Sequence, residues 1–495
     1  MHRLTPEKIR NFWASSPPEI LASLLRVTKR RGVRLFLVGG TVRDWLLGRA
    51  TNDLDIAAAG PVRPLAELLR QELGGGALVD LSATDDEVIR VVWHGEQIDF
   101  SSFRAGVPTI EEDLSLRDFT LNALAVPLTP DKAAVEILDP NGGLADLQAR
   151  RIRHCPGAFA ADPVRMLRGF RLAATLDFVI EPETAAEIRE KAHLIGRVAA
   201  ERITYEMRII FGSDRTAETL TAMDQSGLLR LLLPELYEGE GVEQPEFHHL
   251  DVLGHSFLAL EMMEKIIAEP GSFFAGDEAI TRYLEEENAK VSLKWAALLH
   301  DIGKPATREF PPEGQGRVTF YRHDEVGREI FQRFAERCRW SNADTERTGG
   351  LIAMHMHPFH LCNLQLERGR ITRRAAVKLC RRAGRDLPGL FLLAMADSLA
   401  SKGEKKPERM EEELTLLYET VRQTYLEFIE PVLRGPRLIT GRDLIEQFDL
   451  TPGPLFTELL AELEIARVEG AVVDRQTALS WVAEYLRHDR DERPV

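Results

Sequence analysis

The first part of the chain alternates short apolar runs with polar turns. Within residues 33–104 the runs VRLFLVGG, ALVDLS, VIRVVW and QIDFSSF have the length and the β-branched or aromatic content of strands. Between them, PLAELLRQEL carries its apolar residues at helical spacing. The pattern predicts a small α/β domain.

From about residue 159 onward the apolar positions recur with the period of a helix, as in DPVRMLRGFRLAATL and PETAAEIREKAHLI. A chain of 495 residues exceeds what one hydrophobic core usually organises. Clusters of Pro, Gly and charged residues predict divisions that give four domains, 1–155, 156–240, 241–404 and 405–495. We therefore expect an α/β N-terminal domain followed by three mainly α-helical domains.

Composition narrows the class of protein. Hydrophobic residues make up 44% and charged residues 28%, and no apolar run approaches the roughly 20 residues of a membrane helix. The segment MHRLTPEKIRNFW lacks the apolar stretch of a secretory signal, and the four cysteines have no paired CxxC spacing. These features predict a cytoplasmic protein with reduced cysteines and no membrane partner.

The net charge of −15 counts against a nucleic-acid partner, but binding responds to local fields. Residues 370–385 contain seven Lys or Arg and no acid, and residues 150–171 contain six Arg and one Asp. Each stretch could bind phosphates. A solvated basic helix face is the alternative, above all for the first stretch.

Residues 37–56, LVGGTVRDWLLGRATNDLDI, carry the first candidate chemistry. A strand that runs into Gly39 and Gly40 and then into a helix presents backbone N–H groups to a triphosphate. Asp53 and Asp55 are two positions apart, so a strand projects both carboxylates from one face. Such a pair can hold Mg²⁺ for two-metal phosphoryl transfer. Alone, a D-x-D pair is usually a solvated turn; the preceding GG-x-x-RD element favours a site.

With these motifs the sequence resembles the polymerase-β-type nucleotidyltransferases, specifically the class II CCA-adding enzymes and bacterial poly(A) polymerases. Four further segments resemble that family in its order: LRDFTLNALA (116–125), DPNGGLADLQARRIR (139–153), DPVRMLRGFRLA (162–173) and ERITYEMRIIF (201–211). The resemblance implies a polymerase-β-like head over residues 1–155, a nucleotide-recognition and RNA-binding neck, and catalytic Mg²⁺ on Asp53 and Asp55. It also implies nucleotide binding by Gly39, Gly40, Arg43, Arg117, Asp162, Arg165, Arg168 and Arg171.

Asp162 and Arg165 suggest how a base could be chosen without a template. On a helix they would be neighbours on one face, the carboxylate accepting hydrogen bonds and the guanidinium donating them. That pair matches the amino donor and ring acceptor of cytosine or adenine, whereas uracil and guanine present a carbonyl. A surface ion pair is the alternative. Family members commonly carry Glu before this Asp, where this chain has Ala161. Asp99, in QIDF, is either a third carboxylate or a strand-edge surface residue.

The number of added nucleotides depends on a segment that is short here. Only AGVPTIEEDLSL separates Arg104 from the RDFT motif, where CCA-adding members have a longer flexible loop. Members that add only two cytidines resemble this chain in having the loop shortened. We therefore expect addition of CC, with complete CCA addition, A addition and poly(A) synthesis as alternatives.

A second constellation lies between residues 246 and 398. It places His and Asp in EFHHLDVLGHSFLA, KWAALLHDIGKP, FYRHDEVGREI, AMHMHPF and LLAMADS, a ligand set for one or two divalent metals that can activate water. It resembles the HD phosphohydrolase superfamily, which assigns residues 241–404 to an HD domain. The resemblance implies metal ligation by His255, His300, Asp301 and Asp397, with His323 and His355 completing a second site or binding phosphate. Lys304 is expected to meet a phosphate, and His249 and His357 are weaker candidates.

Together the two constellations predict a template-independent tRNA nucleotidyltransferase that uses CTP, ATP or both on tRNA or another RNA 3′ end. The HD domain would act on RNA-end or nucleotide phosphates with a divalent metal. Residues 405–495 resemble the C-terminal body that holds the RNA in long class II enzymes. A nucleotide-signalling HD hydrolase has the two domains in the opposite order. A catalytically silent RNA-binding protein would not need the complete set of acids.

Overall fold

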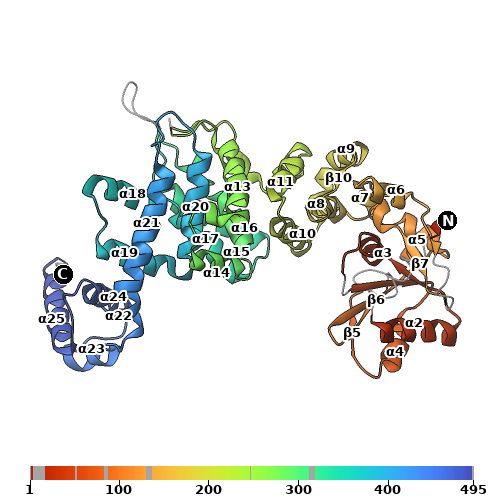
Figure 1. Ribbon diagram of the computed structural model, residues 1–495, viewed down its shortest axis with the longest axis horizontal. Helices are drawn as coiled ribbons and strands as arrows, with labels where there is room; N and C mark the ends of the chain where they lie inside the picture. The colour runs from red at the N-terminus through yellow and green to blue at the C-terminus, as the bar shows by residue number, and fades with distance from the viewer. Residues whose placement is uncertain are drawn as a thin grey trace. The chain divides into compact units, whose positions relative to one another are not determined.

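The computed structural model describes residues 2–3, 17–50, 53–82, 87–129, 136–245, 247–310 and 318–492. Apart from His2 and Arg3, the N-terminal segment MHRLTPEKIRNFW lies outside the described residues. The chain forms two compact units, Met1–Leu232 and Leu233–Val495 (Figure 1). The finer division into four domains remains a prediction. Among the described residues, no helix combines the length and the apolar composition that crossing a membrane requires.

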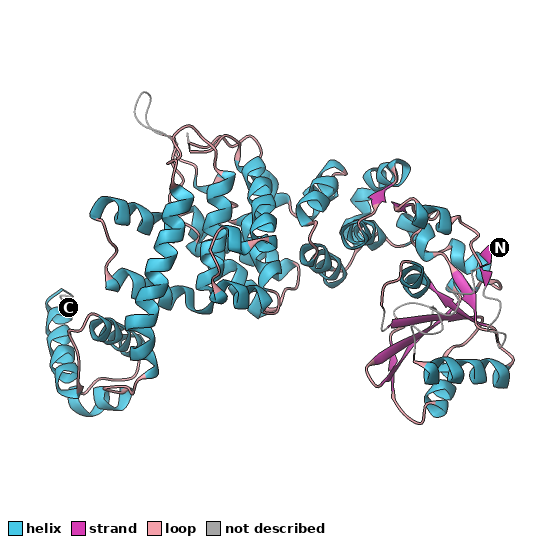
Figure 2. Cartoon of the chain, viewed as in Figure 1, coloured by secondary structure: helices cyan, strands magenta, loops and turns pink. Residues whose placement is uncertain are grey.

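All named strands of the described chain belong to the first unit, and the second unit is built from helices (Figure 2). The expectation of an α/β N-terminal part followed by mainly helical structure is confirmed. The strands are β1 (His2–Arg3), β2 (Leu35–Val38), β3 (Asp53–Ala58), β4 (Ala77–Asp80), β5 (Val88–Trp93), β6 (Glu96–Ser102), β7 (Ala125–Pro127), β8 (Glu136–Ile137), β9 (Arg151–Ile152) and β10 (Val179–Ile180).

A six-stranded sheet with the order β4-β5-β6-β3-β2-β7 organises the first unit. Its pairs are antiparallel except for β3 and β6, which run parallel with Asp55 opposite Asp99. The runs VRLFLVGG, ALVDLS, VIRVVW and QIDFSSF supply β2, β4, β5 and β6, as predicted. Because β3 and β2 lie inside the sheet, the turn after β2 and the start of β3 are held at fixed positions.

The first helices of this unit accompany the sheet, and those after residue 157 form its helical second half. They are α2 (Pro18–Arg31), α3 (Gly39–Leu46), α4 (Arg63–Glu72), α5 (Ile110–Ser115), α6 (Gly143–Gln148), α7 (Ala158–Ala161), α8 (Val164–Leu176), α9 (Pro182–Lys191), α10 (Ala200–Gly212), α11 (Thr216–Gln225) and α12 (Leu228–Leu232), with 3₁₀ turns η1 (Arg104–Gly106), η2 (Thr120–Asn122) and η3 (Ala192–Arg197). One continuous core joins α2 and α4 to the sheet through Leu24, Ile56, Leu69 and Phe100, each fully buried. Burying such side chains is the main favourable term in folding.

The second unit is a helical bundle followed by a smaller group of helices. Its elements are η4 (Pro234–Gly239), α13 (Val252–Ala268), η5 (Pro270–Ser272), α14 (Glu278–Glu285), α15 (Ala289–Leu299), η6 (Pro305–Thr307), α16 (His323–Arg337), α17 (Asn342–Met354), α18 (His357–Arg368), α19 (Arg373–Ala383), η7 (Gly384–Asp386), α20 (Leu387–Ala400), α21 (Met410–Thr424), a π-helical turn η8 (Tyr425–Ile429), α22 (Glu430–Arg434), α23 (Gly441–Phe448), α24 (Pro454–Val468) and α25 (Arg475–Glu492). Helix α20 is buried along nearly its whole length and packs against α13, α15 and α21. A helix that is apolar all round is expected at the centre of such a bundle.

Candidate functional site

The turn between β2 and α3 lets other side chains approach its backbone closely. Gly39 has φ +64°, a left-handed conformation that favours glycine. A Cβ atom on Gly39 would lie 3.1 Å from Nη1 of Arg117 and 3.3 Å from Oδ2 of Asp55. The missing side chain therefore leaves room for a guanidinium and a carboxylate at the start of the helix. We call Gly39, Asp53, Asp55 and Arg117 the carboxylate site.

The start of β3 presents the two acidic residues. Leu54 is buried, and the flanking Asp53 is exposed and Asp55 half-buried, so the pleat directs both carboxylates to the opposite side from Leu54. Thr41, in the first turn of α3, ties this segment in place. Its Oγ1 accepts a hydrogen bond from the Asp55 amide at 2.7 Å and donates to the Asp53 carbonyl at 3.1 Å.

Electrostatics at Asp55 favour a cation. Burial raises the pKa of the Asp55 carboxyl above its ordinary value, and the charges of Asp99 and Asp53 raise it further, while Arg117 lowers it. The ionised Asp55 carboxylate is thus disfavoured mainly by burial and in part by repulsion from two neighbouring carboxylates. A divalent ion held by carboxylate oxygens would relieve that repulsion, so the residues present fit the Mg²⁺ expected here.

Asp99 lies directly opposite Asp55 on the central strand β6. The alternative that Asp99 is a strand-edge surface residue is wrong, because β6 is flanked by β3 and β5 and the residue is half-buried. Both carboxylate oxygens accept hydrogen bonds from Arg90, at 2.7 and 2.8 Å. A role for Asp99 as third carboxylate ligand stays a prediction.

Arg117 is held by a buried carboxylate that the motif reading missed. Asp113, on α5, is fully buried and contacts Arg117 Nη2 at 3.0 Å and Arg104 Nη1 at 2.9 Å. Burial lowers the pKa of the Arg117 guanidinium to about 10, and the neighbouring Arg104 charge acts in the same direction. Asp113 therefore orients a buried cation beside Gly39. Its position four residues before Arg117 was the available sequence signal.

The segment from Asp162 to Arg165 differs from the prediction. Asp162 lies outside the helix, with φ −150° and ψ 99°, and α8 begins at Val164. The prediction that Asp162 and Arg165 share a helical face is wrong, because the residue before a proline is driven out of the helical region and Pro163 follows. Instead, Arg202 on α10 donates to Asp162 Oδ2 at 2.7 Å.

The three arginines of α8 point back to the first half of the unit and to α10. Arg165 donates to the Leu116 carbonyl at 3.1 Å, and Arg168 donates to Asp118 Oδ2 at 3.0 Å. Arg171 lies 3.1 Å from Oε2 of Glu206 on α10. The three guanidinium groups are half-buried, and each is oriented by a partner outside α8.

A chain of hydrogen bonds connects Arg168 on α8 to Arg43 on α3. Arg43 donates to Asn122 Oδ1 at 2.7 Å, and Asn122 donates to Asp118 Oδ1 at 3.1 Å. Asp118 in turn accepts from Arg168, and it is 7% exposed. The sequence motif LRDFTLNALA contains Asp118 and Asn122, but nothing local revealed that they join α3 to α8.

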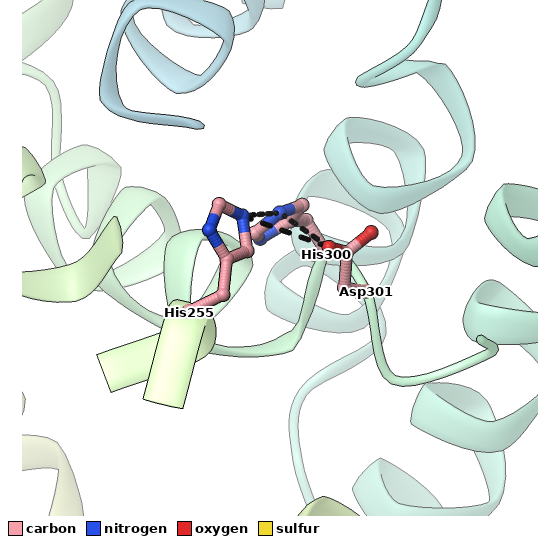
Figure 3. A group of neighbouring side chains, drawn as sticks. All are labelled: His255, His300 and Asp301. Atoms are coloured by element: carbon pink, nitrogen blue, oxygen red, sulfur yellow. Dashed lines mark hydrogen bonds and ion pairs between the residues drawn. The ribbon is translucent and has the colours of Figure 1, made fainter. Parts of the chain in front are cut away.

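In the second unit, the predicted ligands of the HD motif meet in one buried cluster. Figure 3 shows His255, His300 and Asp301 pointing towards one another. Nε2 of His300 lies 3.2 Å from Asp301 Oδ2, and Nε2 of His255 lies 3.1 Å from Asp397 Oδ1. We call these four residues, with His323 and His355, the histidine cluster.

Asp301 joins the two halves of the histidine cluster. Its Oδ2 faces His255 and His300, and its Oδ1 faces His323 at 3.4 Å and His355 at 3.7 Å. Each half brings three ligand atoms within 4.8 Å of one another. A carboxylate with one oxygen in each half can bridge two cations, so the donor set fits one or two divalent metals.

Three of the histidines are fixed with Nε2 inward. The Nδ1 atoms of His300, His323 and His355 each lie 2.7–2.9 Å from the carbonyl oxygen three residues earlier. Such a bond places the proton on Nδ1 and leaves the Nε2 lone pair for a metal. The backbone at the helix ends thus selects the ligating tautomer.

Charge in the cluster also favours a cation. Burial lowers the pKa of His300, but Asp301 and Asp397 outweigh burial and raise that pKa to about 10. His355 lies farther from the carboxylates, and burial beside His323 and His300 lowers its pKa to about 3. His355 is therefore a neutral imidazole, whereas the two carboxylates favour positive charge at His300; a divalent cation held there would replace the second proton and leave Nε2 of His300 as a ligand.

A pocket of about 530 Å³ opens beside the cluster and includes Asp301, Asp397 and His323 in its lining. Lys304, immediately before η6, donates to Asp301 Oδ2 and to Gln244 Oε1, both at 2.6 Å. His248 lines the same pocket, with its ring centroid 4.6 Å from that of His255. His249, a weak candidate in the sequence, is exposed and outside the lining, and the sequence analysis did not single out His248.

His357 also lies outside the cluster. It begins α18, and its Nε2 accepts a hydrogen bond from Arg382 at 2.8 Å. Its part in metal binding is therefore not supported by its position. The residues that the HD motif placed first, His255, His300, Asp301 and Asp397, are brought together.

Comparisons with known families agree with the order of these sites along the chain. Residues 35–153 match the "Poly A polymerase head domain", residues 177–238 the "Probable RNA and SrmB- binding site of polymerase A", residues 252–400 the "HD domain" and residues 435–483 the "tRNA nucleotidyltransferase domain 2 putative".

Two relatives align along nearly their whole length. The A-adding tRNA nucleotidyltransferase of Deinococcus radiodurans is 34% identical over 90% of this chain and 94% of that protein. The CC-adding tRNA nucleotidyltransferase of Thermus thermophilus is 32% identical over 92% of this chain and 94% of that protein. The fold resembles a CCA-adding enzyme with CTP (TM-score 0.63, 19% identity, 96% and 98% of the two chains). It also resembles the Thermotoga maritima CCA-adding enzyme complexed with tRNA (TM-score 0.61, 20% identity, 96% and 98%).

Proposed function

The chain belongs to the family of tRNA nucleotidyltransferases with a poly(A) polymerase head domain and an HD domain, and from that premise we propose that it adds two cytidylates to tRNA 3′ ends. The reaction joins the 3′-hydroxyl of the RNA to the α-phosphorus of CTP and releases pyrophosphate. The observation that carries the proposal is the placement of Asp55 and Arg117 against the side-chain-free Gly39 turn.

The carboxylate site would do this chemistry as follows. Asp53 and Asp55 would hold Mg²⁺, which when bound activates the terminal hydroxyl and neutralises the leaving pyrophosphate. Gly39 and Gly40 let the triphosphate approach the backbone N–H groups at the start of α3. Arg117, held by Asp113, would contact the phosphates, and Arg43 would support them from the first turns of α3.

The base would be chosen by Asp162 and Arg165, although not as neighbours on one helix. Arg202 engages Oδ2 of Asp162, which leaves Oδ1 to accept from the exocyclic amino group of cytosine. Arg165 is fixed by the Leu116 carbonyl and would donate to the ring acceptor. Position 161 is alanine, and in this chain the contact that would orient the recognition carboxylate comes from Arg202.

Restriction to CC rests on the connection between Arg104 and Arg117. It consists of the turn η1 and helix α5, and the Asp113 carboxylate fastens both of its ends. A segment fixed in this way leaves little freedom to reshape the pocket from cytosine to adenine. Product analysis on tRNA truncated at the discriminator nucleotide tests this, with each nucleoside triphosphate alone and then CTP with ATP. Two added cytidylates and no adenylate support the proposal; three residues ending in A refute the restriction.

A addition is the second candidate, because the Deinococcus radiodurans relative of that name aligns over 94% of its length. An A-adding enzyme would extend tRNA that already ends in CC, using ATP, and would leave tRNA truncated at the discriminator unextended. Poly(A) synthesis would give long homopolymers on the same substrates. One gel therefore separates these activities.

We further propose that the histidine cluster is a metal-dependent phosphohydrolase acting on RNA-end or nucleotide phosphates. His255, His300, Asp301 and Asp397 would hold the first metal, and His323 and His355 a second or the phosphate. A bound metal would supply a nucleophilic hydroxide from water. Asp301→Ala should abolish hydrolysis of 2′,3′-cyclic and terminal phosphates while nucleotide addition continues. A nucleotide-signalling hydrolase would instead consume guanosine polyphosphates and add nothing to tRNA.

A further inference from the structure

Five of the seven cations in the basic segment 370–385 form two groups with different surroundings. The cations on one side of α19 are neutralised within the chain, because α24 supplies carboxylates to each of them: Arg374 to Glu462 and Glu469, Lys378 to Glu462, and Arg381 to Glu464. This part of the segment fastens α24 to α19. It is therefore not a free phosphate-binding surface.

The other group lines a separate pocket of about 380 Å³. Its walls come from α17, the end of α19, η7 and the start of α20, and it includes Arg347, Arg382 and Arg385. The two carboxylates in the lining are already occupied: Asp386 lies 2.9 Å from Arg347 Nε, and Glu346 accepts from Arg328 at 2.9 Å.

Arg382 and Arg385 are thus left without carboxylate partners. Both are exposed at the pocket. Arg382 donates to the neutral acceptor Nε2 of His357, which orients the guanidinium without cancelling its charge. Within the described part of the chain, Arg385 makes no hydrogen bond or ion pair. Below them Arg347, 7% exposed, is paired with Asp386 and Glu286, so the uncompensated charge of the pocket comes from Arg382 and Arg385.

We propose that this arginine pocket binds the RNA backbone, with one phosphodiester group at Arg382 and a neighbouring one at Arg385; the proposal rests on the proposed function only in taking tRNA as the substrate. Guanidinium groups match phosphate oxygens in a bidentate geometry. Exposed arginines hold a polyanion through the release of its counterions, an effect that a single small anion does not provide. In a chain of net charge −15, two exposed arginines without carboxylate partners at one pocket give a local positive field that favours the approach of RNA.

The test compares tRNA affinity at several salt concentrations for the full chain and for Arg382→Ala/Arg385→Ala. Each lost phosphate contact lowers the slope of log K against log salt by roughly 0.9, so the pair should lower it by about 1.8. The ratio of the wild-type binding constant for tRNA to that of the alanine variant should then fall by about twelvefold between 50 and 200 mM salt. Arg282→Ala/Arg333→Ala removes the same charge from exposed positions outside the pocket lining and should leave the slope unchanged.

Arg382→Lys/Arg385→Lys keeps the charge and should retain the slope, and circular dichroism identifies any variant that fails to fold. If the alanine variant folds and keeps the wild-type slope, the proposal is overturned. Binding of inorganic phosphate and of CTP is measured in parallel; a loss confined to these small anions would identify a free-anion site and also overturn it. A wild type that binds tRNA but does not extend it would contradict the proposed function alone, since the slope comparison needs no catalysis.

Discussion

Replacing Asp113 by asparagine should destabilise the first unit and impair nucleotide addition together. The Asp113 carboxylate is fully buried and pairs with Arg117, which is 7% exposed, and with Arg104. Asparagine fits the same space but carries no charge. The variant therefore removes the carboxylate that pairs directly with the buried Arg117 guanidinium and leaves Asp55 as its remaining acidic neighbour.

The size of the effect follows from that burial. Removing one partner of a buried ion pair costs about 3–5 kcal/mol. Because the Arg104 side chain is 29% exposed and water can solvate it, we expect the lower value, about 3 kcal/mol. For a unit of the size of Met1–Leu232 this corresponds to a fall in melting temperature of about 6–12 °C. The KM for CTP should rise as well, because Arg117 loses its orientation.

The assay combines thermal unfolding with two activities on one preparation. The phosphohydrolase activity proposed for the second unit should be unchanged below the melting transition. Asp177→Asn is the matched control, since Asp177 is 63% exposed and its pairs with Arg150 and Arg215 are worth about 0–1 kcal/mol. A melting temperature and a KM for CTP within error of the control would refute the role given to Asp113.

The stabilisation that Asp113 gives the fold should depend on pH in a definite direction. Burial raises the pKa of Asp113, but Arg117 and Arg104 outweigh burial and hold it below 3.8. A carboxyl with a lowered folded-state pKa stabilises the fold fully above its unfolded pKa and progressively less as the pH falls below that value. The stability difference between wild type and Asp113→Asn should therefore stay constant from neutral pH down to about pH 5 and shrink at lower pH. A difference that grew on acidification would contradict the assignment.

Three further predictions concern the two sites. Gly39→Ala should lower CMP incorporation far more than Gly48→Ala, because both glycines have positive φ but only at Gly39 would a Cβ meet functional groups; equal losses in incorporation would argue against close approach. Arg202→Ala should raise misincorporation of UMP relative to CMP by freeing Asp162, and Arg202→Lys should restore discrimination; unchanged selectivity would exclude Arg202 from base choice. Chelation should abolish phosphohydrolase activity, with recovery on adding back a divalent metal to the wild type but not to Asp301→Ala; hydrolysis that survives chelation would exclude a metal-dependent reaction.

Local patterns were sufficient for the elements and for the ligands that lie within one motif. The strands β2 and β6 follow from short apolar runs, and the placement of Asp53 and Asp55 on one face of β3 follows from their spacing of two residues. The HD motif likewise specified His255 and Asp301, since its residue types and order are distinctive. In these cases the information is contained in a short stretch of chain.

Contacts between distant elements were not predictable in this way. Arg202 and Asp162 are 40 positions apart, and no periodicity connects them. The same holds for the neutralisation of Arg374 by Glu462, which turned a candidate RNA surface into an internal contact. The error at Asp162 differs in kind, because Pro163 was visible in the sequence and the helical model ignored its effect on the preceding residue.

The central claim is that the carboxylate site performs nucleotide addition independently of the histidine cluster. The most direct measurement is incorporation of CMP into tRNA truncated at the discriminator nucleotide by Asp53→Ala, with phosphohydrolase activity measured on the same sample. The account predicts no detectable incorporation and wild-type hydrolysis. Incorporation at the wild-type rate by Asp53→Ala would contradict it.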